Sequence, residues 1–179
     1  MKRSAAVLTM CGLLAIAAAG ARGAEAWKRF VHPTQGFALS YPAGWELMSR
    51  QGTLGVVVVG PEIAGTDGMR VSVSVASENL PREISLDQYE SITESKIALI
   101  FNGYQRLRTD RTQVAGRAAV LRYFTWKRND GLGIYQMQLY TLVGRRAYVV
   151  TATTTTTSPT LAQDAALLRR IMLTFAPGS

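Results

Sequence analysis

Residues 36–45 read GFALSYPAGW and predict the opening hairpin of the fold. The larger side chains Phe37, Leu39 and Tyr41 alternate with smaller ones, which is the period of a β-strand. Turns are expected on either side, in HPTQG (32–36) and PAG (42–44), because proline fixes φ and glycine tolerates positive φ. Since Phe37 and Trp45 each follow a turn glycine and begin a strand, we expect both to be core residues.

The rest of the chain predicts further antiparallel strands. A β-branched run at 54–59 is typical of a strand covered on both faces, and the strict alternation over 69–75 is typical of a half-buried strand. Asn129-Asp130-Gly131 predicts a tight hairpin turn. Further strands are expected at 27–31, 45–48, 104–112, 117–127, 132–143 and 147–156.

Two windows repeat their apolar residues at helical spacing. The first begins at Ser85, which has capping-box spacing to Gln88, and should end near Asn102-Gly103. The second is expected to open at Ser158-Pro159, with serine as the cap and proline at the first helical position. Together these elements predict an α+β fold, in which a mainly antiparallel sheet is flanked by two main helices.

Composition indicates one globular domain and excludes several classes of site. The chain has 179 residues, a net charge of +8, 47% hydrophobic and 18% charged residues, which argues against disorder. A structural zinc site needs about four nitrogen or sulfur ligands, and a disulfide framework needs paired cysteines. One cysteine and one histidine can build neither.

Residues 1–26, MKRSAAVLTMCGLLAIAAAGARGAEA, are typical of a cleaved secretory signal peptide. Lys2 and Arg3 precede an apolar run shorter than the roughly 20 residues of a spanning helix. Ala24-Glu25-Ala26 is an A-x-A cleavage site, and Ala19-Gly20-Ala21 is a second option. The residues around Cys11 do not form a lipobox. We therefore expect a single domain over 27–179, exported to the periplasm or outside the cell, with no transmembrane segment after cleavage.

No catalytic motif stands out, so no enzyme activity and no cofactor are predicted. His32 is the only candidate base and lies in a proline-flanked turn, where an exposed histidine is the simpler interpretation. The glycine-rich segment 60–68 is expected to be a hairpin connection. Its two carboxylates, Glu62 and Asp67, leave a weak calcium site open, because calcium prefers oxygen ligands.

Arginines gather in the second half of the chain. Arg106 and Arg108 are two residues apart and should share one strand face. Arg122 and Arg146 come from neighbouring strands, so these four arginines predict one basic binding face for anionic lipid or an acidic partner. Such a face can also bind nucleic acid, but export argues against that ligand. The alternative is a solvated face whose arginine stems cover apolar surface.

The order of these elements resembles the PsbP family, whose fold is also seen in a eukaryotic Ran-binding nuclear-transport factor. GFALSYPAGW is similar to the family's opening hairpin, G-F-x-x-x-Y-P-x-G-W, and residues 85–101 are similar to its first long helix. Residues 134–140, 144–148 and 168–175 resemble its last hairpin and terminal helix. The resemblance implies an α/β/α sandwich. No position matches an ion-ligand motif, so no binding residue is carried over.

Three hypotheses of function follow. The first is a non-enzymatic exported domain that binds a protein partner or an anionic surface at the cell envelope. The second is an extrinsic accessory protein of photosystem II in the thylakoid lumen, which the best-known plant and cyanobacterial PsbP members imply. The third is an unrecognised hydrolase.

Overall fold

The computed structural model describes residues 26–49 and 54–178, so the predicted signal peptide and Cys11 lie outside the described residues. Within these ranges the chain forms nine strands and two helices. The strands are β1 (Trp27–Val31), β2 (Ala38–Pro42), β3 (Glu46–Ser49), β4 (Leu54–Glu62), β5 (Arg70–Asn79), β6 (Gln105–Val114), β7 (Arg117–Lys127), β8 (Gly133–Val143) and β9 (Arg146–Thr155). The helices are α1 (Leu86–Ile100) and α2 (Leu161–Leu173).

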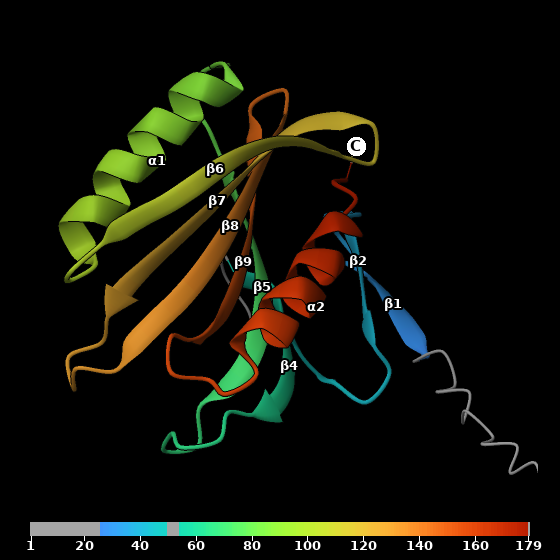
Figure 1. Ribbon diagram of the computed structural model, residues 1–179. Helices are drawn as coiled ribbons and strands as arrows, with labels where there is room; N and C mark the ends of the chain where they lie inside the picture. Colours follow the sequence, from blue (N-terminus) through green and yellow to red (C-terminus); the bar gives the residue numbers. More distant parts are fainter. Residues whose placement is uncertain (1–25, 50–53, 179) are drawn as a thin grey trace, which may run out of the picture.

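Seven strands form one antiparallel sheet in the order β3-β4-β5-β9-β8-β7-β6, and β1 pairs with β2 in a separate ribbon. The helices lie on opposite faces of the large sheet (Figure 1). We call these the α1 face and the α2 face. The predicted α+β sandwich is therefore confirmed.

The main core lies on the α2 face and includes residues of the β1–β2 ribbon and of the turn before β3. The predicted hairpin over 36–45 does not form, because β2 pairs with β1 and β3 pairs with β4. Phe37 is fully buried and packs against Tyr148 of β9 and Phe175 after α2, with ring centroids 6.2 and 5.9 Å away. Trp45 is 8% exposed. A Cβ at Gly60 would lie 2.5 Å from its ring, so glycine is what allows β4 to approach Trp45. The core placement of Phe37 and Trp45 is confirmed.

Helix α1 begins as predicted and α2 does not. Ser85 and Gln88 form the full capping box of α1. In α2 the N-cap residue is Thr160, and Pro159 lies before the helix rather than at its first position. The Ser158 hydroxyl instead accepts the Thr160 N–H and donates to Asp164 at 2.8 Å, so it stabilises the turn that leads into the helix.

Strand β4 also departs from its prediction. Val56 and Val58 are buried on the α2 face, whereas Val57 and Val59 are only half-buried on the α1 face. The expectation of a strand covered on both faces is wrong, because α1 packs mainly on β7 and β8 and does not extend over β4. No helix in the described residues is long and apolar enough to span a membrane.

Candidate binding groove

The structure does not bring the four predicted arginines into one basic face. Arg106 is exposed on β6 and pairs with Glu94 of α1 at 2.9 Å. Arg108 lies on the other face of the sheet, where its guanidinium sits 4.1 Å over the Tyr123 ring. Arg146 lies at the start of β9, opposite Asn79, and Arg122 is fully buried.

A β-bulge explains why Arg106 and Arg108 diverge. Arg106 is opposite Phe124 in β7, and Arg108 is opposite Tyr123, the adjacent residue. The extra residue between them shifts the register, so the two arginines point to opposite faces despite their spacing of two. The single basic face is therefore wrong.

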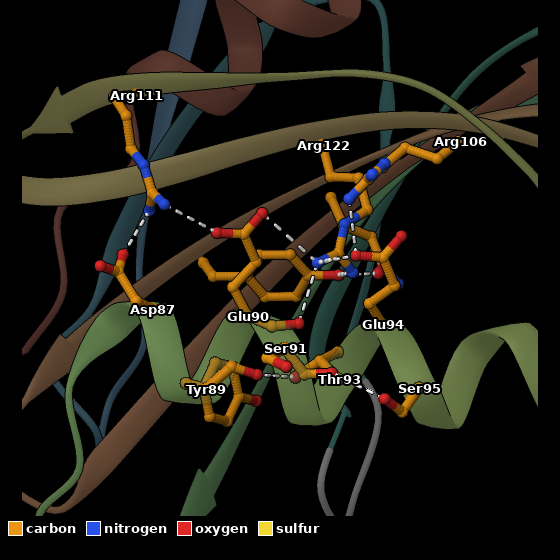
Figure 2. A network of polar contacts seen from close by, with 12 residues as sticks. Asp87, Tyr89, Glu90, Ser91, Thr93, Glu94, Ser95, Arg106, Arg111 and Arg122 are labelled. Carbon is orange, nitrogen blue, oxygen red and sulfur yellow. Dashed lines mark hydrogen bonds and ion pairs between the residues drawn. The ribbon is translucent and has the colours of Figure 1, made fainter.

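Arg122 is the centre of a polar network that holds α1 on the sheet (Figure 2). One terminal nitrogen donates to the main-chain oxygen of Glu90 at 2.9 Å and lies 3.6 Å from the carboxylates of Glu90 and Glu94. The other donates to the Tyr140 hydroxyl at 3.3 Å. On the rim, Arg111 pairs with Asp87 and Glu90 at 2.9 and 3.1 Å.

The sequence of α1 explains why charge holds it in place. Asp87, Glu90 and Glu94 recur at helical spacing and face the arginines of β6 and β7. Only Tyr89 and Ile97 of the helix are buried. Tyr89 packs in a small apolar cluster with Val120 and Tyr140 of the sheet, and the buried guanidinium of Arg122 adds a polar anchor for the helix.

Two tyrosines extend this polar contact toward the middle of the sheet. The Tyr140 hydroxyl donates to Gln138, and the Tyr89 hydroxyl donates to Glu78 at 2.6 Å. Their ring centroids are 5.8 Å apart, edge to face. Burial raises the pKa of both hydroxyls above that of a free tyrosine, and the hydrogen bond to Glu78 raises the pKa of Tyr89 further.

A groove of about 660 Å³ lies beside this network, between α1 and the sheet. Its lining comes from β5, β8 and β9 of the sheet, from α1, and from the connection between β5 and α1. Apolar side chains alternate with a few polar ones, and two cationic side chains, Arg82 and Lys96, belong to its lining. The lining includes Ala76, Glu78, Leu80, Ile84, Tyr89, Ile92, Thr93, Gln138, Val149 and Thr151.

The groove between α1 and the sheet was not predicted from the sequence. Gln138 and Thr151 lie on neighbouring strands and are joined by a 3.4 Å hydrogen bond, a pairing that no local pattern reveals. Ile92 is the one groove residue that the sequence pattern of α1 could have indicated. It is a large apolar residue beside the buried stripe of α1, and it remains 47% exposed.

His32 and the 60–68 segment take structural positions. The Nδ1 atom of His32 accepts the Gln35 N–H at 3.1 Å, and the ring packs 4.8 Å from Phe37, so the histidine is half-buried rather than exposed. Glu62 ends β4 and Asp67 lies in the turn before β5, both exposed. Among the described residues, no group of three or more His, Cys, Asp or Glu could hold a metal ion. The weak calcium site stays a prediction.

We expect Tyr140→Phe to flatten the loss of stability at alkaline pH. A tyrosine in the unfolded chain ionises near about pH 10, whereas folded Tyr140 has a raised pKa and keeps its proton longer. Its contribution is therefore full below about pH 10 and is lost as the pH rises above that value. Urea midpoints at about pH 8 and about pH 11 should differ less in Tyr140→Phe than in the wild type. Equal differences in both proteins would contradict this assignment.

Solved structures with the PsbP-like fold match the chain over most of its length. Cyanobacterial PsbP (CyanoP) from Synechocystis is 13% identical with a TM-score of 0.62, covering 90% of this chain and 98% of its own. LpqN, described as involved in cell envelope biogenesis of Mycobacterium tuberculosis, is 11% identical with a TM-score of 0.65, over 86% and 91%. The Ran-binding protein Mog1p of Saccharomyces cerevisiae is 12% identical with a TM-score of 0.61, over 86% and 96%. The chain thus has the PsbP-like fold.

The family assignment comes from sequence. The sequence model of the family described as serine/threonine kinase C-terminal domain matches residues 29–176. The chain belongs to this family. No curated protein matches the sequence of the chain.

Proposed function

We propose that the chain is an exported, non-enzymatic domain that binds a protein partner at the cell envelope through the groove between α1 and the sheet. The observation that carries the proposal is the groove itself. Its volume of about 660 Å³ is within the usual range of binding sites, and a largely apolar lining with a few polar groups is typical of recognition.

The charge distribution supports a protein partner over an anionic membrane surface. Arg106, Arg111 and Arg122 all engage carboxylates of α1, and Arg108 and Arg128 each pair with an aspartate two residues away. These pairs partly cancel the positive field around β6 and β7, which weakens the attraction of this region for a uniform anionic layer. A shaped groove selects instead for a complementary polypeptide.

Export and the non-enzymatic role rest on separate support. The signal-peptide pattern of residues 1–26 favours the periplasm or the cell exterior. LpqN, which shares the fold, is described as involved in cell envelope biogenesis. The family name describes a domain at the C-terminal end of serine/threonine kinases, which is in keeping with a recognition module. His32 Nδ1 is engaged by main-chain donors, which disfavours the hydrolase hypothesis. The likeness to CyanoP extends only to the fold and does not favour a photosystem role.

Affinity capture with a groove variant tests the proposal. Ile92→Glu places a charge in the groove at a half-exposed position, so stability should change little while partner capture from envelope extract falls by about tenfold or more. Gln163→Glu, on an exposed position of α2 on the opposite face, adds the same charge and should capture as the wild type does. Equal capture by Ile92→Glu and wild type would refute the groove as the binding surface.

A further inference from the structure

Half of the α1 face is left open by this chain. Helix α1 packs mainly on β7 and β8, and its Tyr89 shares a buried cluster with Ala147 at the start of β9. The described residues place no helix over β4, β5 and the second half of β9 on the same face. The side chains there are small and only half-buried, so the sheet surface is accessible. They are Val57, Val59, Ser72, Ser74, Ala76, Thr151 and Thr153.

The open strip has the dimensions of one helix. Neighbouring strands lie about 4.8 Å apart, so three strands present a strip roughly 14 Å wide. A helix with its side chains is about 10–12 Å in diameter. Serine, alanine and threonine side chains allow the backbone of such a helix to come close to the sheet.

The side of α1 that borders this strip carries exposed side chains at helical spacing. Tyr89, Ile92 and Lys96 are spaced i, i+3 and i+7 and all line the groove. Ile100 continues that row, one turn after Lys96, and is 70% exposed. A partner helix lying alongside α1 would bury Ile92 and Ile100, which the chain itself leaves exposed.

Charge separates the two sides of α1. The carboxylates of Asp87, Glu90 and Glu94 are all engaged by arginines on the β6 side. On the groove side, Lys96 and Arg82 form no ion pair within the described part of the chain, and Glu78 of β5 accepts the Tyr89 hydroxyl. Two cationic side chains against one carboxylate leave the groove lining with a net positive charge.

We propose that the open half of the α1 face binds an acidic amphipathic helix of a partner protein, which lies alongside α1. Its apolar stripe packs on Ile92 and the small side chains of β5 and β9, and its carboxylates pair with Lys96 and Arg82. This is helix-in-groove recognition, and it rests on the proposed function that the groove binds a protein.

Selection of peptides from a displayed library of random 20-residue sequences tests the helix. Peptides retained by the full chain, but not by Ile92→Glu, should carry apolar residues at i, i+3, i+4 and i+7 with flanking Asp or Glu, and should become helical on binding. Lys96→Glu should weaken their binding by about tenfold or more, and exchanging one peptide carboxylate for lysine should restore it. Lys28→Glu, the same charge change on exposed β1, should have no such effect.

The outcomes separate the two proposals. Peptides that depend on Ile92 but bind as extended or uncharged segments would refute the acidic helix and leave the groove as a protein-binding site. Failure to retain any Ile92-dependent peptide would count against both. Self-association of the chain that Lys96→Glu abolishes, measured by sedimentation, would show that a second copy covers the strip and would overturn the proposed partner.

Discussion

Arg122→Ala should lower the free energy of unfolding by about 3–5 kcal/mol, the usual loss when one member of a buried ion cluster is removed. The guanidinium of Arg122 is fully buried, and the side chains of Glu90 and Glu94 are 12% and 26% exposed. Without the arginine these two carboxylates would face the sheet with no buried counter-charge. Because Arg122 contacts both Glu90 and Glu94 of α1, the helix should loosen as well.

Urea denaturation measures this loss of stability, and two further variants serve as controls for it. Arg106→Ala removes an exposed ion pair with Glu94 and should cost less than about 1 kcal/mol. The triple variant Arg122→Met, Glu90→Gln, Glu94→Gln removes all three charges at once and should recover most of the loss. A cost for Arg122→Ala no larger than that of Arg106→Ala would contradict the role of Arg122 in holding α1.

Trp45→Ala is the second large effect and should also cost about 3–5 kcal/mol, as truncations of large core side chains do. Trp45 is 8% exposed and its ring lies against Gly60 of β4, so alanine would leave a cavity in the main core on the α2 face. Leu47→Ala, at a 39% exposed position of β3, should cost far less. A denaturation midpoint for Trp45→Ala that equals the wild-type value would show that Trp45 is not a core residue.

Local sequence patterns were enough to predict most of the fold. The strand over 38–42, the capping box at Ser85 and the turn at Asn129-Asp130-Gly131 all depend on neighbouring residues, and the structure contains each of them. The hairpin predicted over 36–45 is wrong, because β2 pairs with β1 and β3 pairs with β4. The start of α2 was misplaced because Ser158 and Pro159 fit a helix start by type. Their hydrogen bonds with Thr160 and Asp164 instead place them in the preceding turn.

The candidate site could not be predicted in the same way, because it depends on register and on distant packing. The bulge between Arg106 and Arg108 reverses which face Arg108 occupies, and no residue type marks it in the sequence. Arg122 was expected on the surface, yet three residues of α1 and β8 enclose it. Predicting the groove requires knowing that α1 does not extend over β5 and β4. That depends on tertiary packing, which local sequence patterns do not reveal.

Site-specific photo-crosslinking tests the central claim most directly. A photoreactive amino acid at position 92, in the groove, and another at position 163, on the opposite face, are introduced separately into the full chain in the cells that produce it. We predict that position 92 gives a discrete crosslinked partner polypeptide whose attachment site lies in an acidic, apolar-striped segment, and that position 163 does not. Crosslinks of equal yield from both positions, or none from position 92, would contradict the groove as the binding surface.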